Sequence, residues 1–255
     1  MVNSIWTSVG FDDDFQKTLD QIDKDKVLSL NDPAGFDYIA AYVDPSGVTL
    51  SLFAADGEST QETLTLHNPS PATVEAFQVT PGMAVVDLLD ADGELFSRFL
   101  TMVDDPQMYP VYSLQSIGKC PRYDQYQIGA IAQDVRVYDS VAEWEEHSRV
   151  SNPEGLRIGP KFIASPGLFA LHAGDASAED INSLAAFVAV CDQVETVTNH
   201  VTGQEWYRIK ADCGFSCTLA LPIDAPTAPR TGSVVDGNVF LTGTTGLWQP
   251  ADRQQ

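Results

Sequence analysis

The stretch from Gln204 to Ala211, QEWYRIKA, holds side chains that could bind a ligand at a regular spacing. In a β-strand, alternate side chains point to opposite faces, so Trp206, Arg208 and Lys210 would share one face. If the residues between them face the core, these three form an exposed aromatic and basic stripe. An aromatic ring can stack on a base or a sugar, and neighbouring cations can hold a phosphate or carboxylate. We therefore take the three as candidate ligand-binding residues. The alternative is a structural face whose cations pair with local acids such as Glu205.

The four cysteines, Cys120, Cys191, Cys213 and Cys217, raise the question of a metal site. Cys213 and Cys217 are separated by three residues, and Cys191 could lie on an adjacent strand, so three thiolates could gather a zinc ion. The usual second cysteine pair is missing, and a free cysteine is commonly a small buried hydrophobe. We expect free thiols, no metal and no cofactor.

The segment around Asp90, Asp92 and Gly93 has the acidic residues of a calcium loop. With Gly93 as the loop glycine, that pattern requires oxygen ligands at Leu88 and Phe99. Neither side chain carries an oxygen, so a tight turn between two strands is favoured instead.

Signatures of common catalytic sites are missing from the sequence. The histidines are scattered and form no HExxH pattern, and there is no G-x-S-x-G, GxGxxG or P-loop motif. The sequence therefore names no catalytic residue, although an active site can be assembled in space from distant positions.

Composition indicates a soluble globular protein with an acidic surface. The chain has 255 residues, of which 44% are hydrophobic and 20% charged, and its net charge is -22. No apolar run reaches the roughly 20 residues of a membrane helix, and the N-terminus lacks the features of a secretory signal. The charge repels nucleic acid and anionic membranes at long range. We expect a cytoplasmic protein whose partner is a small ligand or another protein.

The elements of the first half follow from periodicity and turn chemistry. We expect a short strand from Asn3 to Val9 and then an amphipathic helix, because apolar residues recur at helical spacing from Phe11 to Ile22. A hairpin is predicted over 37–43 and 48–54, with a helix starting after Asp32 as the alternative, and a third strand over 62–67. Ser70 and Pro71 predict a helix start, and 83–89 with 94–100 predict another hairpin.

We place a domain boundary near Pro110, which gives an N-terminal α+β domain, 1–110, and a β-rich domain, 111–255. The second part is expected to contain a strand or strand pair over 126–138, a helix that starts at Ser140 and a short strand over 168–172. A helix then starts at Ser177, with a strand-like end from Val188 to Cys191 as the alternative, and strands follow over 193–198, 204–212 and 215–222. Asp236 and Gly237 predict a two-residue turn between 233–235 and 238–241.

These elements predict an α+β, mainly β fold with antiparallel sheets. The last five strands would suit a small Greek-key barrel of the oligonucleotide/oligosaccharide-binding type, which is an analogy of pattern. The expected function is a non-catalytic binding or interaction module. The alternatives are a small-molecule enzyme with a site between the two domains and a structural subunit of a homo-oligomer.

Overall fold

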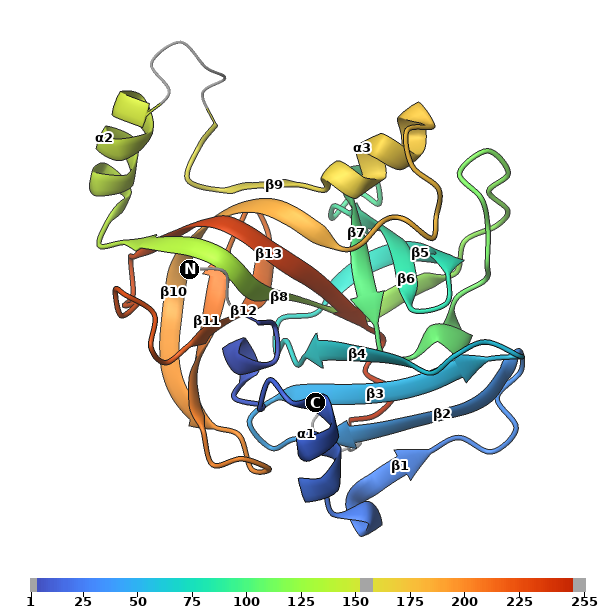
Figure 1. Ribbon diagram of the computed structural model, residues 1–255. Coiled ribbons are helices and arrows are strands. Elements are labelled where there is room, and N and C mark those ends of the chain that lie inside the picture. Colours follow the sequence, from blue (N-terminus) through green and yellow to red (C-terminus); the bar gives the residue numbers. More distant parts are fainter. Residues whose placement is uncertain (1–3, 152–157, 250–255) are drawn as a thin grey trace.

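In the computed structural model, which describes residues 4–151 and 158–249, the chain forms two β-sheets and a few short helices (Figure 1). Strands hold 48% of the residues and helices 14%, and most strand pairs are antiparallel. The predicted class, α+β and mainly β, is therefore confirmed.

The first sheet contains a hairpin whose tight turn lies at 44–47. The Asp44 carboxylate accepts the backbone N–H of Ser46 at 2.9 Å, and the backbone N–H of Gly47 donates to the Asp44 carbonyl. This local chemistry fixes the predicted hairpin, and the third predicted strand pairs with it. The sheet has the order β1-β2-β3-β4, with bounds Val27–Ser29, Phe36–Val43, Val48–Ala55 and Gln61–Leu66.

The second sheet has nine strands and closes on itself twice. The long strands β8 and β13 pair along most of their length, and each has a second edge with two sets of partners. One ring runs from β13 through β10, β11 and β12 back to β8, and the other through β7, β6 and β5 back to β8. The bounds are Ala72–Thr80 (β5), Met83–Leu89 (β6), Leu95–Val103 (β7), Arg122–Tyr138 (β8), Phe162–Ala164 (β9), Leu184–Thr198 (β10), Glu205–Asp212 (β11), Ser216–Pro222 (β12) and Val234–Thr244 (β13).

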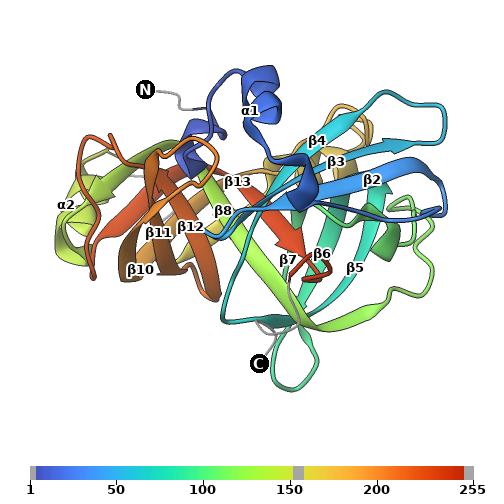
Figure 2. The same cartoon turned by 90° about the horizontal axis from the view of Figure 1, so that it is seen from below.

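Both faces of β8 are buried, which explains its nearly continuous apolar run. Tyr126, Ile128 and Ala130 join the main core, whereas Ile131 joins the cluster that contacts the first sheet. Seen from below, β10–β12 lie on one side of β8 and β13, and β5–β7 lie on the other (Figure 2). Strand β4 packs across β7, β8 and β13, so the first sheet covers the outside of the shared strand pair.

Short helices complete the fold. Helix α1 covers the first sheet near the N-terminus, and α2 extends from the end of β8 (Figure 1). No helix among the described residues is long and apolar enough to cross a membrane. The helix bounds are Thr7–Val9 (η1), Phe15–Gln21 (α1), Lys24–Lys26 (η2), Pro106–Met108 (η3), Val141–Ser151 (α2) and Pro166–Ala173 (α3).

Several local predictions are wrong because long-range pairing outweighs local signals. The chain after Ser70 and Pro71 forms strand β5 rather than a helix, since it pairs with β6 and β8 and is rich in β-branched residues. The predicted strand from Asn3 to Val9 is, from Ser4 onward, a turn followed by η1, and Asn3 lies outside the described residues. Ser177 does bond Asp180 through its hydroxyl at 2.6 Å, but the chain then enters β10.

The predicted strand over 168–172 is wrong, because this segment forms α3. Pro166 occupies the first turn, where its missing N–H costs nothing, and Gly174 ends the helix in the left-handed conformation. The backbone N–H of Gly174 donates to carbonyls of the last turn. These two signals outweigh the short apolar run between them.

The predicted turn at Asp236 and Gly237 is also wrong, because β13 continues through both residues. Gly237 has φ 149°, and a Cβ atom there would lie 2.2 Å from the carbonyl oxygen of Asp134 on β8. The glycine therefore lets two strands approach closely rather than turning the chain. The predicted C-terminal barrel has five strands. In the structure, β10, β11, β12 and β13 form a ring whose fifth strand is β8.

The predicted boundary near Pro110 is crossed by the nine-stranded sheet, since β5–β7 precede it and β8–β13 follow it. The main core likewise combines Val74 and Phe99 with Leu219 and Leu241. Independent folding of the two parts stays a prediction, as does the finer comparison with an oligonucleotide/oligosaccharide-binding barrel.

Candidate functional site

Trp206, the aromatic member of the predicted stripe, is fully buried. It lies in a cluster with Val9, Phe11 and Ile131, which come from the N-terminal segment and β8. The expected exposure of this ring is therefore wrong. Side chains along β11 do alternate between the two faces of the strand. The face that carries Trp206 is buried, however, because the N-terminal segment packs on it.

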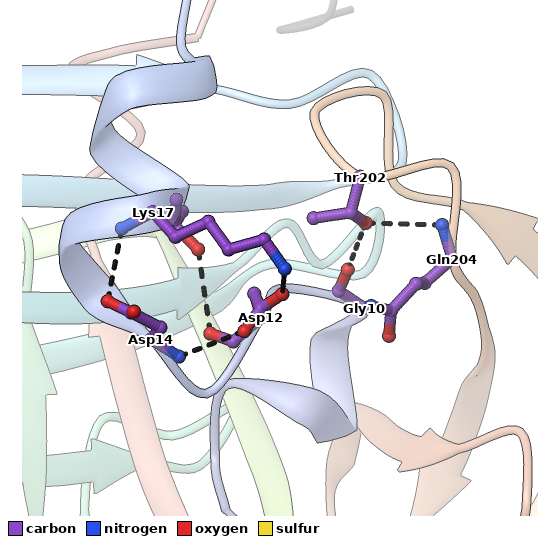
Figure 3. A network of polar contacts seen from close by, with 7 residues as sticks. Gly10, Asp12, Asp14, Lys17, Thr202 and Gln204 are labelled. Atoms are coloured by element: carbon purple, nitrogen blue, oxygen red, sulfur yellow. Dashed lines mark hydrogen bonds and ion pairs between the residues drawn. The ribbon is translucent and has the colours of Figure 1, made fainter.

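Figure 3 shows how that segment is attached to the loop before β11. The Thr202 hydroxyl donates to the Gly10 carbonyl and accepts the backbone N–H of Gln204 at 3.1 Å. Gly10 has φ 75°, and a Cβ atom there would lie 3.0 Å from Cδ1 of Trp206. A residue without a side chain is needed for this close approach. Next to it, Asp12 pairs with Lys17 of α1.

Arg208 of the predicted stripe links strands. Its guanidinium donates to the Ser46 carbonyl at 2.8 Å and to the carboxylate of Glu195 on β10 at 2.7 Å. Lys210 is half-buried, with Gln193 and Thr218 as its strand neighbours. The structure thus brings the three residues onto one strand face without forming an exposed aromatic platform, and their role in ligand binding remains untested.

Three of the four thiols do gather, inside the C-terminal ring. Cys191, Cys213 and Cys217 are buried free thiols of the main core. Burial raises the pKa of Cys191 to about 12, and the hydrogen bond from Cys213, together with burial, raises the pKa of Cys217. High thiol pKa values oppose thiolate formation, and thiolate is the form that binds metal. Over residues 4–151 and 158–249, no group of three or more His, Cys, Asp or Glu side chains is placed to hold a metal ion.

The predicted turn around Asp90 is confirmed. The Asp90 carboxylate accepts hydrogen bonds from the backbone N–H groups of Asp92 and Glu94, each at 2.9 Å. These bonds stabilise the turn of the β6–β7 hairpin. These bonds are those of an Asx turn.

A cleft of about 1220 Å³ lies between α2 and the strand pair β8–β13, and we call it the α2 cleft. The connection from β12 to β13 forms another wall through Pro222 and 225–227. Charged side chains line it, and they come from both strands and from the helix. The charged residues are Asp134, Arg136, Glu143, Glu146 and Asp236, and the His147 imidazole lies among them.

Helix α2 is held in place at one wall of the cleft by Trp144. This side chain is 2% exposed, and its indole N–H donates to the Asp236 carboxylate at 2.7 Å. The helix start matches the predicted capping box, since the Ser140 hydroxyl accepts the backbone N–H of Glu143 at 3.3 Å. The Glu143 carboxylate in turn accepts the backbone N–H of Asp139.

More acidic than basic side chains line the α2 cleft. Arg136 is the cross-strand partner of Asp236, and its guanidinium lies 3.2 Å from Nε2 of His147. A guanidinium can only donate, so Nε2 of His147 is the acceptor in this contact. Four carboxylates and one cation, Arg136, line the cleft, and one of the four, Glu146, is also paired with Arg149 at 2.7 Å. The lining therefore keeps an excess of negative charge, which attracts cationic groups.

Sequence reasoning missed the α2 cleft because its parts are far apart in the chain. Trp144 and Asp236 are 92 residues apart, and only the pairing of β13 with β8 brings them together. The capping box predicts the helix, but no local pattern predicts what the helix faces.

A second polar cluster that the sequence did not reveal is the buried pair Asp104 and Asp105, at the end of β7. Their exposures are 1% and 0%. Burial, and then the charge of Asp105, raises the pKa of Asp104 well above its usual range. Burial also raises the pKa of Asp105, and hydrogen bonds from Thr245 and Tyr109 offset part of this effect. Because neither carboxyl reaches solvent, the pair is not placed to meet a substrate.

Comparison of the chain with models of protein families, with curated proteins and with solved structures finds no match.

Proposed function

We propose that this protein is a non-catalytic binding module that takes up a small organic cation, with at least two amino groups, in the α2 cleft. The observation that carries the proposal is the convergence of four carboxylates on one cleft, from two strands and a helix. Ammonium groups are suitable partners because each can donate to several carboxylate oxygens.

The shape of the cleft supports a small ligand. A volume of about 1220 Å³ slightly exceeds the roughly 300–1000 Å³ typical of small-molecule sites. Two of its walls are fixed: β8 and β13 are paired along the cleft, and the Trp144 indole holds α2 against Asp236. A largely preformed site loses little affinity to ordering on binding.

The net charge of -22 supports the same ligand class, because it concentrates cations near the surface. The buried free thiols support the finer proposal of a cytoplasmic location, where cysteines stay reduced.

The test is calorimetric titration of the protein with spermidine at low and physiological salt. Asp134→Asn combined with Glu146→Gln removes two charges from the cleft, and we expect at least a tenfold loss of affinity. Neither side chain is needed to hold Trp144, whose partner is Asp236.

The matched control is Asp13→Asn combined with Asp92→Asn. Both residues are exposed and lie outside the cleft, and the change in net charge is the same. The control should bind spermidine nearly as the unaltered protein does. Equal losses in the two double variants would show that binding follows net charge alone and would refute the site.

A further inference from the structure

The carboxyls of Asp104 and Asp105 lie where the two sheets and the C-terminal segment meet. The Thr65 hydroxyl on β4 donates to the Asp104 carboxylate at 2.5 Å, and the Ser51 hydroxyl on β3 donates to the Asp104 carbonyl at 3.0 Å. The indole N–H of Trp248 donates to the same carbonyl at 2.8 Å. One short segment after β7 therefore holds the first sheet and the C-terminal segment to the nine-stranded sheet.

The two carboxyls have unequal surroundings. Asp105 accepts three hydrogen bonds, from the backbone N–H of Thr245 at 2.8 Å, from its hydroxyl at 2.5 Å and from the Tyr109 hydroxyl at 2.9 Å. Asp104 Oδ1 has no hydrogen-bond partner among the described residues and is shielded from solvent. A buried charge needs donors, so the negative charge belongs on Asp105 and a proton on Asp104.

No cation compensates the pair from the elements packed against it. The titratable groups that face it are Tyr109, which directly follows η3, and Tyr123 and Tyr126 of β8, and burial raises the pKa of all three hydroxyls. The groups from β3, β4 and the end of β13 are hydroxyls and backbone amides. In the described part of the chain, no Lys or Arg forms an ion pair with either carboxylate.

We propose that Asp104 and Asp105 form a proton-dependent latch, closed while Asp104 is protonated and opened when its proton passes to base in the solvent. Loss of the proton places two negative charges on adjacent buried residues, and the hydroxyls that face Asp104, those of Thr65 and Thr244, carry no compensating charge. The repulsion between the two carboxylates is relieved when β3, β4 and Trp248 separate from the end of β7, because water then reaches both carboxylates.

The direction of the pH effect follows from the raised pKa of Asp104. The folded protein keeps a proton that the unfolded chain releases above the ordinary value of 3.8. The stabilisation is therefore fully present below that value and is lost as the pH rises to the pKa of the folded state.

Infrared spectroscopy of the unaltered protein tests the proton directly. A buried neutral carboxylic acid has a C=O stretching band separate from that of carboxylates. We expect this band at neutral pH, and we expect Asp104→Asn to remove it. Asp92→Asn, an exposed position, is the matched control and should keep it. The absence of the band from the unaltered protein at neutral pH would overturn the proposal without relying on any variant.

Opening of the latch is followed by Trp248 fluorescence during an alkaline titration. Trp248 is 5% exposed and packs against Phe36, Ile39 and Phe53 of the first sheet. Its emission should shift to longer wavelength at the pH where the infrared band disappears, and Asp104→Asn should abolish this step while Asp92→Asn keeps it. Trp248→Phe identifies which part of the emission belongs to this residue. Loss of the band without a Trp248 shift, or a band that persists until the whole protein unfolds, would contradict the latch.

Discussion

Replacing Gly237 with Ala tests whether β13 runs unbroken between β8 and β10. A Cβ atom at this position would lie 2.2 Å from the Asp134 carbonyl oxygen and 2.7 Å from Cα of Val135. Both contacts are to backbone, so no side chain can rotate away. The strands must separate by about 1 Å, because ordinary carbon–oxygen contacts exceed roughly 3 Å.

The magnitude follows from what that separation disrupts. Backbone hydrogen bonds around the pairs Asp236 with Arg136 and Asn238 with Asp134 would be weakened, at about 1 kcal/mol each. The positive φ of 149° adds about 1 kcal/mol of backbone strain for alanine. We expect a total loss of about 3–5 kcal/mol in the free energy of unfolding, in the range of core disruptions.

The assay is urea unfolding followed by circular dichroism, with Gly203→Ala as the matched control. Gly203 also has positive φ, 73°, but a Cβ atom there meets no atom within 4 Å, so only the strain of about 1 kcal/mol applies. If Asp236 and Gly237 formed an open turn instead, the two variants would cost the same. Equal losses would therefore refute the continuous strand and the closed rings that depend on it.

Three further predictions concern charge, thiols and Trp206. Urea midpoints should rise with sodium chloride, because screening relieves the self-repulsion of a net charge of -22; a flat or falling midpoint would mean that ion pairs dominate. In the native protein, Cys120 should react with a thiol reagent before the buried Cys191, Cys213 and Cys217. All four thiols should react in urea, and a chelator should leave the Tm unchanged. Fewer than four reactive thiols in urea would contradict this prediction. Trp206→Ala should lower the unfolding free energy by about 3–5 kcal/mol because the ring is fully buried; a loss below about 0.5 kcal/mol would indicate an exposed ring.

Sequence reasoning succeeded where the determining contacts are local. The hairpin of β2 and β3 follows from Asp44 and Gly47, and that of β6 and β7 from Asp90, because these residues bond their own turn backbones. The start of α2 follows in the same way from Ser140 and Glu143. In each case, a few neighbouring residues contain the whole signal.

It failed where closure of the rings decides the outcome. Segment 72–80 has a helix start at its beginning, yet the pairing of β5 with β8 turns it into a strand. Gly237 resembles a turn residue until Asp134 is known to face it. Burial of Trp206 depends on Gly10, almost two hundred positions away, and alternation along β11 says nothing of what covers that face.

The candidate site and the latch could not be predicted for a related reason. Acidic residues are abundant throughout this chain, so neither Asp236 nor the pair Asp104 and Asp105 stands out by type. These residues differ from the other acids only in their positions in the fold. Asp236 accepts the indole N–H of Trp144 from a distant helix, and Asp104 and Asp105 lie under the first sheet.

The most direct test of the proposed binding site is a titration of the ¹⁵N-labelled protein with spermidine, followed through the tryptophan indole N–H signals. The indole of Trp144 donates to Asp236 at the wall of the α2 cleft, whereas Trp206 is fully buried beneath the N-terminal segment. Binding in the cleft should shift the Trp144 signal saturably and leave the Trp206 signal in place. A saturable shift of Trp206 with Trp144 unchanged, or no saturable shift at all, would contradict the proposed site.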